Sequence, residues 1–288
     1  MTSDFTYITT CKGRLEHIKK TLPRAVSQPG MEVIVVDYDC PDGTQAWIQQ
    51  HFPQVKTVKI SNEPGFHLPK ARNAGGMQAT TKWLGFFDAD ILISENFFEQ
   101  VLPSLKERCF YRFAPLTLQS WGSVICERSA FERTKGYDTN FHGWGVEDDD
   151  FYSTLEFFGY NLEKLSSKLL SEIDHTNDLR TRFYSTSKFK SHQINECYRV
   201  IKLDLMRING NHVPAAVLEG LYQQIRSEIL KTTEAGLNAV DIKLSFPPTT
   251  IHGPDPIDET GRRPMTKVRR GFTYQLNWEL LSNAGPEN

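Results

Sequence analysis

The sequence has few cysteines and no closely spaced pair of them. Its 288 residues include five cysteines, an odd number spread along the chain, and no CxxC motif occurs. A disulfide framework needs paired cysteines and a structural zinc site needs closely spaced ligands, so this pattern argues against both. A reducing compartment is the simplest interpretation.

Long apolar runs are also missing. No stretch is long enough to span a membrane, and the segment Met1–Thr10 is too short and too polar for a signal peptide. We therefore expect a cytoplasmic protein without a transmembrane segment, with at most peripheral contact with the inner face of a membrane.

The chain has no excess of one charge. It carries 33 Lys and Arg against 35 Asp and Glu, a formal net charge of -2. Nothing in this balance favours a nucleic acid or an anionic membrane as a partner. With 39% hydrophobic and 24% charged residues, the composition is that of an ordinary globular protein, long enough for one large domain or a domain with an appendage.

Short β-rich runs alternate with helical stretches over the first hundred residues. The clearest runs are Glu32–Asp37 and Trp83–Asp88, which are almost continuously apolar before their final acid, as expected for strands buried on both faces. Helical spacing appears in Arg14–Ser27 and Pro69–Thr80. This alternation predicts an α/β fold, a mostly parallel Rossmann-like sheet flanked by helices.

The last hundred residues have a different pattern. The chain reads as helical from Ser191 to about Ala235, whereas His252–Gly271 is rich in proline, glycine and charge and predicts a loop. We divide the chain into a domain at 1–190 and a helical extension at 191–288 that carries a flexible basic loop. The helices either shape a substrate site or form a homodimer. The loop cations close over an anionic ligand as a lid, form a solvated surface or bind an anionic acceptor; they are Arg262, Arg263, Lys267, Arg269 and Arg270.

Two carboxylates, Asp88 and Asp90, follow the apolar run that begins at Trp83. In an open α/β sheet, ligands bind beyond the carboxyl ends of the strands. Two carboxylates there are suitable ligands for a hard divalent cation that also binds phosphate oxygens. A strand-ending turn, where aspartate is common, is the alternative interpretation.

A second acidic motif is Gly-Trp-Gly-Val-Glu-Asp-Asp-Asp, residues 143–150. The helix dipole favours one or two acids at a helix start, but four in succession repel one another. Phe151, Leu155 and Phe158 follow at helical spacing and would anchor the acidic end on a packed helix. A carboxylate cluster beside an aromatic ring suits a sugar site, because the ring stacks on the sugar while a carboxylate accepts a hydroxyl proton.

The two motifs, in this order, resemble those of GT-A glycosyltransferases. The N-terminal half is similar to the family-2 enzymes. The second motif is similar to that of the β-1,4-galactosyltransferase and polypeptide N-acetylgalactosaminyltransferase group, whose signature reads Trp-Gly-Gly-Glu-Asp-Asp; Val146 replaces its second glycine. The resemblance covers about Phe5 to Phe183. It implies an inverting, metal-dependent transfer of a sugar of the Gal, GalNAc, Glc or GlcNAc type from a UDP-sugar to a hydroxyl of a glycan, glycolipid or glycoprotein.

The resemblance also implies roles for single residues. Asp148 would be the general base and Glu147 would orient the acceptor. Manganese or magnesium would be bound by Asp90, Asp88 and His175. The sugars would be contacted by Trp121, Gly122, Trp144, Gly145 and Asp149.

Residues at strand ends and in an Ala-Arg-Asn run match the family's nucleotide contacts. Taken singly, Arg72 is equally well explained as a solvated helical cation and Asp37 as a strand-end cap. Their shared location at strand ends favours a nucleotide-sugar site, whose residues would be Thr9, Thr10, Lys12, Arg14, Asp37, Asp39, Arg72, Asn73 and Asp88.

Three other functions compete with this interpretation. A nucleotidyltransferase would normally have a glycine-rich phosphate loop, whereas Thr9–Arg14 contains only Gly13. A catalytically silent GT-A domain that binds glycans would keep the fold without the turnover. A glycoside hydrolase also uses paired carboxylates but would need no nucleotide site.

Overall fold

The computed structural model describes residues 4–115, 120–174, 181–209, 213–234, 239–245, 249–251, 266–268 and 271–277. The chain divides into two compact units, Met1–Asn195 and Glu196–Asn288. This division lies close to the boundary at residue 190 that the sequence predicts.

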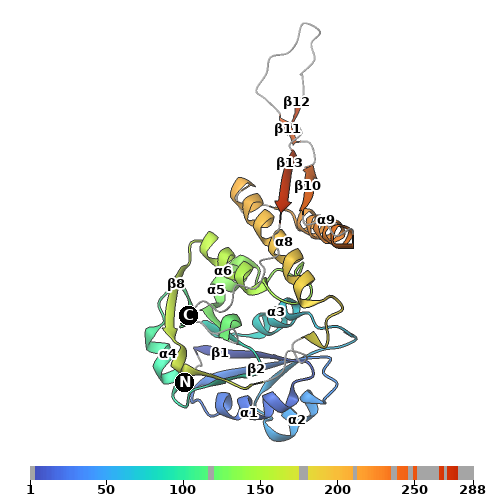
Figure 1. The fold of residues 1–288 in the computed structure, drawn as a ribbon. Coiled ribbons are helices and arrows are strands. Elements are labelled where there is room, and N and C mark those ends of the chain that lie inside the picture. The colour runs from blue at the N-terminus through green and yellow to red at the C-terminus, as the bar shows by residue number, and fades with distance from the viewer. Residues whose placement is uncertain are drawn as a thin grey trace, which may run out of the picture. The chain divides into compact units, whose positions relative to one another are not determined.

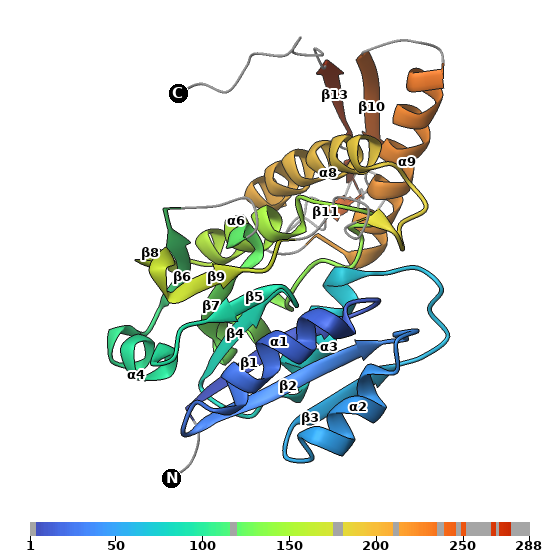
Figure 2. The ribbon, with the colours of Figure 1, turned by 60° about the horizontal axis from the view of Figure 1, so that its bottom comes forward.

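A mostly parallel sheet with helices on both faces forms the centre of the first unit (Figures 1 and 2). The strands lie in the order β3-β2-β1-β4-β7-β6-β8. Only β7 runs antiparallel to its neighbours, β4 and β6, and the other pairings are parallel. The fold class predicted from the sequence is confirmed. The strands are β1 (Phe5–Cys11), β2 (Met31–Tyr38), β3 (Lys56–Ile60), β4 (Trp83–Phe87), β6 (Cys109–Ala114), β7 (Val124–Glu127) and β8 (Asn161–Ser166).

The helices divide between the two faces of this sheet. One face packs against α1 (Leu15–Val26), α2 (Thr44–His51) and α4 (Phe97–Val101). The other packs against α3 (Leu68–Gln78), α5 (Arg128–Thr134) and α6 (Glu147–Phe157). The smaller elements are the strand pair β5 (Ile91–Ile93) and β9 (Leu170–Glu172) and the 3-10 turns η1 (Leu102–Ser104), η2 (Ser120–Gly122) and η3 (Ser167–Leu169).

Burial on both faces explains the nearly continuous apolar runs in the central strands. Every residue of β1 and of β4 is buried. Alternate side chains point to opposite faces, so Tyr7 and Phe87 join the cluster beneath α1, whereas Ile8 and Phe86 join the cluster beneath α3. A strand that packs on helices above and below has no polar face.

Helix α3 packs unusually close to the sheet. A Cβ atom at Gly75 would lie 2.5 Å from Cγ2 of Ile8, so only glycine allows this approach. Arg72 lies about one turn earlier on the same helix, and only 2% of its surface is exposed. The close packing of α3 therefore brings a guanidinium group under the edge of the sheet.

The order of the strands places a switch point between β1 and β4. From β1 the chain builds outward through β2 and β3, and it then returns to add β4 on the opposite side of β1. The crevice at the carboxyl ends of such strands is the usual ligand site of open α/β sheets. Here these ends are Cys11 and Phe87, followed directly by Lys12 and Asp88.

The second unit contains helices and short antiparallel strand pairs. α8 (Lys188–Asn209) crosses the division between the units, and α9 (Ala215–Glu234) follows it. In the second unit the rings of Tyr198 and Tyr222 lie 5.3 Å apart at 82°. The extension is not helical throughout, because β10 (Ala239–Ser245) pairs with β13 (Gly271–Asn277) and β11 (Thr249–Ile251) with β12 (Thr266–Val268). Of the basic loop cations, Lys267 lies in β12, and Arg262, Arg263, Arg269 and Arg270 lie outside the described residues.

Among the helices described by the structure, none combines the length and the apolar composition needed to cross a membrane.

Candidate active site

A cavity of about 370 Å³ lies at the carboxyl edge of the sheet and brings the two acidic motifs together. This volume is within the range of small-molecule sites. Its walls come from the segments after β1 and β4, from η2, from the start of α6 and from residues 183–192. The residues predicted from the sequence that line it are Thr10, Lys12, Arg14, Asp88, Asp90, Trp121, Gly122, Trp144, Gly145, Glu147, Asp148 and Asp149.

The acidic wall is the first turn of α6. Its helix begins at Glu147, and Asp148, Asp149 and Asp150 complete an acidic first turn. The preceding residue, Val146, has φ 77°, a left-handed conformation that is costly for a β-branched side chain. Asn195 stabilises this entry, since its amide donates to the carbonyl of Gly145 at 2.8 Å and to that of His142 at 3.1 Å.

Arg72 connects the two acidic motifs from inside the protein. Its guanidinium donates to Oδ1 of Asp88 at 2.8 Å and also pairs with Oδ1 of Asp148. A third donation goes to the carbonyl of Gly122 at 3.4 Å. The side chain of Asp88 is 34% exposed and that of Asp148 14%, so the carboxylates reach the cavity while the cation between them does not.

Burial changes the acid-base properties of this wall. Desolvation, followed by repulsion from Asp148, raises the pKa of Glu147 to about 8, although Arg72 acts in the opposite direction. Desolvation also raises the pKa of Asp148, with the ion pair to Arg72 opposing it. Burial therefore raises the pKa of both carboxyls of this wall, that of Glu147 to about 8, and Arg72 opposes the shift at each of them.

Two tryptophans border the acidic wall. The indole N–H of Trp121 donates to Oδ1 of Asp149 at 2.9 Å, and the Tyr152 hydroxyl donates to the Trp121 carbonyl at 2.8 Å. The guanidinium of Arg112 lies between the rings of Trp121 and Tyr152, 4.6 Å from the centroid of the first and 4.2 Å from that of the second. These contacts hold Trp121 in one orientation, although 37% of its surface is exposed.

Trp144 is covered by a cation on its side of the cavity. The ammonium group of Lys188 lies 3.8 Å from the centroid of its ring, and the His192 ring lies at 6.3 Å. Phe183, Tyr184, Lys188 and His192 all line the cavity. Sequence reasoning missed them and Arg112, because no motif or spacing marks these residues.

The predicted metal residues are only partly assembled. Asp88 and Asp90 both line the cavity, and Oδ2 of Asp90 accepts from Arg14 at 3.3 Å. His175 lies outside the described residues. Within the described part of the chain, no three His, Cys, Asp or Glu side chains converge as metal ligands. Two carboxylates on one wall nevertheless suit magnesium or manganese, which commonly use one or two carboxylates and complete their shell with phosphate oxygens and water.

Several predicted nucleotide residues have structural roles instead of facing the cavity. The Asp37 carboxylate accepts from the backbone N–H groups of Cys40 and Gln45, each at 2.8 Å. Oδ2 of Asp39 accepts from the N–H of Glu63 at 3.0 Å. Asn73 both donates to and accepts from the backbone of Tyr137, at 2.7 and 2.8 Å. Thr9 is buried.

The ammonium group of Lys12 is also held by the protein, although Lys12 lines the cavity. It donates to the carbonyl oxygens of Tyr38, Asp39 and Glu63, at 3.3, 3.1 and 2.6 Å. Three carbonyls satisfy all three donors of an ammonium group. Of the predicted nucleotide residues, Thr10, Arg14 and Asp88 are thus the ones whose side chains are best placed for a ligand.

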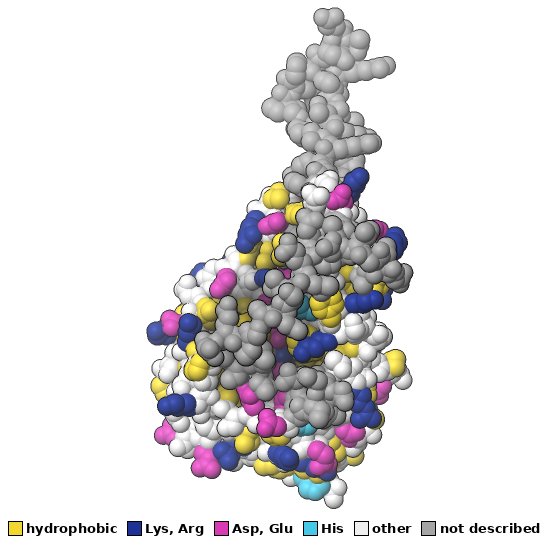
Figure 3. Space-filling view, viewed as in Figure 1, with side chains coloured by type: hydrophobic (Ala, Val, Ile, Leu, Met, Phe, Trp, Pro, Cys, Tyr) yellow, Lys and Arg dark blue, Asp and Glu magenta, His cyan; other side chains and the backbone are white. Residues whose placement is uncertain are grey.

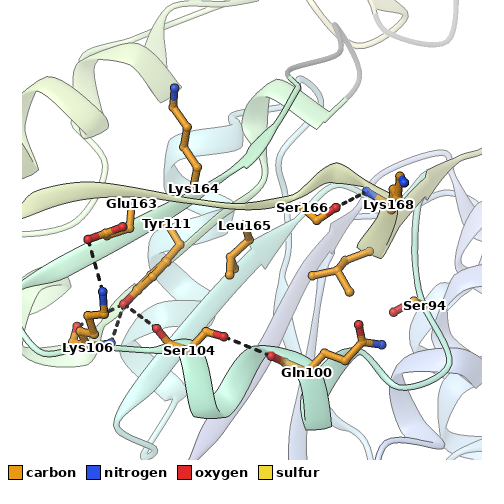
Figure 4. A pocket seen from close by; sticks show the side chains of 11 residues that line it. Ser94, Gln100, Ser104, Lys106, Tyr111, Glu163, Lys164, Leu165, Ser166 and Lys168 are labelled. Atoms are coloured by element: carbon orange, nitrogen blue, oxygen red, sulfur yellow. Dashed lines mark hydrogen bonds and ion pairs between the residues drawn. The ribbon is translucent and has the colours of Figure 1, made fainter.

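A second, larger cavity of about 640 Å³ lies between β8 and the α4–η1 segment (Figure 4). Its polar groups mostly satisfy one another, as the Tyr111 hydroxyl donates to the Ser104 carbonyl and Lys106 pairs with Glu163 at 3.7 Å. Figure 4 shows Lys164 directed away from the other labelled side chains. None of the acidic or aromatic motif residues lines it.

The charged groups on the visible surface are mixed. In the face shown in Figure 3, acidic and basic side chains are interspersed among the residues that are coloured. This agrees with the net charge of -2.

Two family models match adjacent parts of the chain. Glycosyl transferase family 2 matches residues 6–117, and the N-terminal domain of galactosyltransferase matches residues 106–180. The first match contains Asp88 and Asp90, and the second contains Glu147 and Asp148. No curated protein sequence matches the chain.

Solved structures share the fold at low sequence identity. A mannosyltransferase, PcManGT from Pyrobaculum calidifontis, solved with GDP-Man and Mn2+, is 15% identical with a TM-score of 0.53, covering 82% of this chain and 74% of that one. Residues 1–349 of TarS from S. aureus, solved with UDP-GlcNAc, are 16% identical with a TM-score of 0.56, covering 82% and 74%. At this identity the likeness concerns the fold.

The sheet, the cavity at its switch point and the two family matches together define the class of this protein. It has the GT-A fold. It is a glycosyltransferase, similar to family 2 in its N-terminal half and to the galactosyltransferases in the part that carries the second acidic motif.

Proposed function

We propose that the protein transfers a sugar of the Gal, GalNAc, Glc or GlcNAc type from a UDP-sugar to a hydroxyl group of a glycan, glycolipid or glycoprotein, with inversion at the anomeric carbon. The observation that carries this proposal is the cavity itself. It places Asp88 and Asp90, at the end of β4, in one chamber with Glu147 and Asp148, at the start of α6. Donor and acceptor could thus occupy opposite walls of the same site.

The β4 side is suited to the nucleoside diphosphate. Thr10 and Arg14 line the cavity together with Asp88 and Asp90. A divalent cation, Mn2+ or Mg2+, would be held by Asp88 and Asp90, and when bound it would act as a Lewis acid for the departing diphosphate. The GDP-Man and Mn2+ of one solved relative and the UDP-GlcNAc of another support a nucleotide sugar and a metal on this side, since both proteins share the fold.

The α6 side is suited to the acceptor. Trp121 offers apolar ring surface for a sugar, and its hydrogen bond to Asp149 fixes the ring. Trp144 also lines the cavity, with the Lys188 ammonium over one face of its ring. Asp148 would take the proton from the acceptor hydroxyl as its oxygen attacks the anomeric carbon, while the bond from that carbon to the diphosphate breaks. A single displacement of this kind inverts the configuration. Glu147, protonated near neutrality, would donate a hydrogen bond to the acceptor and orient it.

The test is nucleotide release from a panel of UDP-, GDP- and TDP-sugars, with manganese and with a chelator. We expect slow, metal-dependent hydrolysis of one UDP-sugar by the wild-type protein and its loss in Asp90→Ala. The control is Glu95→Ala, because the Glu95 side chain is 82% exposed. Binding of a UDP-sugar without release, in the presence of a broad acceptor set, would instead indicate a silent glycan-binding module. Failure to bind any nucleotide sugar would refute the donor site.

A further inference from the structure

Two cysteines, one in β1 and one shortly after β2, lie beside the Thr10–Arg14 segment of the cavity wall. Cys11 is the last residue of β1, and Cys40 follows β2 by two residues. Their Sγ atoms lie 3.8 Å apart, and both are free thiols. Thr44, at the start of α2, contacts both sulfurs, at 3.2 Å from Cys11 and 3.1 Å from Cys40.

The Cys40 sulfur also supports the backbone of the cavity wall. The N–H of Gly13 donates to it at 3.1 Å. Gly13 has φ 68°, and a Cβ atom there would lie 2.4 Å from the ring of Phe183, so this residue is confined between Cys40 and Phe183. Its neighbours Lys12 and Arg14 line the cavity, as does Phe183.

The two thiols have different reactivities. Hydrogen bonding from Cys11, with further donation from Thr44 and from the N–H groups of Asp42 and Gly13, lowers the pKa of Cys40 to about 6 against the opposing effect of burial. Cys11 is fully buried, and its hydrogen bond to Cys40 together with this burial raises its pKa. Cys40 is only partly buried, so it is the sulfur that an oxidant can reach as a thiolate.

We propose that Cys11 and Cys40 form a reversible disulfide under peroxide, and that this bond weakens nucleotide binding at the adjacent Thr10–Arg14 segment. The Cys40 thiolate attacks hydrogen peroxide; an S–O bond forms, the O–O bond breaks and hydroxide leaves, giving a sulfenic acid. The Cys11 sulfur then attacks the Cys40 sulfur, and the S–O bond breaks as the hydroxyl leaves with the Cys11 proton as water. Overall, two thiols lose two electrons and one peroxide becomes two waters.

The effect on binding follows from the sulfur positions. An S–S bond is about 2.05 Å long, so the sulfurs must approach each other by more than 1.5 Å from their present 3.8 Å. A disulfide sulfur is a weaker acceptor than a thiolate, so the Gly13 N–H loses its partner. Gly13 then loses its support from Cys40 on one side, and the wall of the cavity that it forms against Phe183 shifts. This second part of the proposal depends on the proposed nucleotide site, whereas the disulfide itself does not.

The test oxidises the full-length wild-type protein with hydrogen peroxide at pH 7, alkylates the remaining thiols and maps disulfides by mass spectrometry. We expect a Cys11–Cys40 cross-link that dithiothreitol removes. Titration with UDP and manganese should show weaker binding after oxidation, by about three- to tenfold as for one lost hydrogen bond, and recovery on reduction. Cys197→Ser, which retains the pair, should behave as wild type, and Cys40→Ser should be insensitive to peroxide.

The outcomes separate the two proposals. If peroxide leaves Cys11 reduced, or oxidises Cys40 only to the sulfinic acid, the proposed disulfide is refuted. If the cross-linked protein binds UDP with unchanged affinity, the proposed effect of the disulfide on the nucleotide site is refuted. Reduced protein that does not bind UDP would refute the proposed function, while the cross-link is still measured independently. The mapping uses the wild-type protein and so does not depend on whether Cys40→Ser folds.

Discussion

From behind the wall of the cavity, the buried Arg72 forms an ion pair with Asp148, and the same guanidinium donates to Asp88 at 2.8 Å. One side chain on α3 thus connects the end of β4 with the start of α6. These are the two elements that would hold the donor and activate the acceptor, so their spacing depends on a residue that does not line the cavity.

Replacing Arg72 with methionine should weaken both folding and activity. Two carboxylates would lose their partner, and breaking a buried ion pair generally lowers the free energy of unfolding by about 3–5 kcal/mol. We expect a loss of about 2–3 kcal/mol here, because Asp88 faces the cavity and is partly solvated. Urea denaturation measures this loss. The control is Arg207→Met, which removes an exposed pair with Asp204 and should change the unfolding free energy by less than about 0.5 kcal/mol. Equal effects of the two substitutions would contradict a central role for Arg72.

Asp148→Asn should abolish turnover while the donor still binds. Loss of a general base lowers rates by about 10²- to 10⁴-fold, whereas the amide keeps the shape of the side chain. The measurements are turnover with the identified UDP-sugar and its affinity in a binding titration. Glu156→Gln, an exposed change on the same helix, should retain both. A turnover in Asp148→Asn within threefold of wild type would exclude this residue as the base.

The contribution of Glu147 to the stability of the protein should fall as pH rises from about 5 to about 8. The folded-state pKa of Glu147 is raised to about 8, above its unfolded value, so the folded protein holds a proton that the unfolded chain has released in this range. One such group contributes up to about 1.4 kcal/mol per pH unit. Unfolding free energies measured with chelator present should show a shallower slope for Glu147→Gln than for wild type. Parallel slopes would mean that Glu147 titrates normally.

Gly75→Ala should destabilise the protein and impair the site. Its methyl group would lie 2.5 Å from Cγ2 of Ile8, so α3 must move away from the sheet, at a cost of about 1–3 kcal/mol. The shift would also displace Arg72. Gly220→Ala is the matched control on α9, because no atom lies within 4 Å of its added Cβ; it should stabilise the helix by about 0.5–1 kcal/mol. Thermal melting distinguishes the opposite signs.

Val146→Gly should cost little stability despite removing a buried side chain. The φ of 77° at Val146 is unfavourable for valine by roughly 1–2 kcal/mol. Glycine relieves this strain, which offsets the loss of the apolar contacts. We expect a net change within about 1 kcal/mol in urea denaturation. Val36→Gly, in β2, lacks the compensating relief and should cost about 3 kcal/mol or more. A similar loss in both variants would show that Val146 is not strained.

The acidic and aromatic motifs were identified from the sequence because their placement depends on local rules. Strands buried on both faces are nearly continuous in apolar residues, and a parallel sheet brings their carboxyl ends to one edge. These rules place Asp88 and Asp90 at that edge, and the resemblance to GT-A enzymes implies that Glu147, Asp148 and Trp144 belong to the same site; all five residues line one cavity. The metal role of His175 stays a prediction, because that residue lies outside the described part of the chain.

The roles of Arg72, Lys12 and Asn73 depended on the tertiary structure. Each belongs to a motif, yet its polar atoms are used by groups that are distant in sequence: Asp148 is 76 residues from Arg72, and Tyr137 is 64 from Asn73. The same holds for the sulfur contact between Cys11 and Cys40. Asp37 instead accepts from the backbone of Cys40 and Gln45, only 3 and 8 residues away. Periodicity determined the sheet and its edge, and the resemblance of the two acidic motifs to those of GT-A glycosyltransferases indicated the class of chemistry at that edge. Only the packed chain decided which charged groups face the cavity, because that choice depends on how closely α3 and the strand ends approach one another.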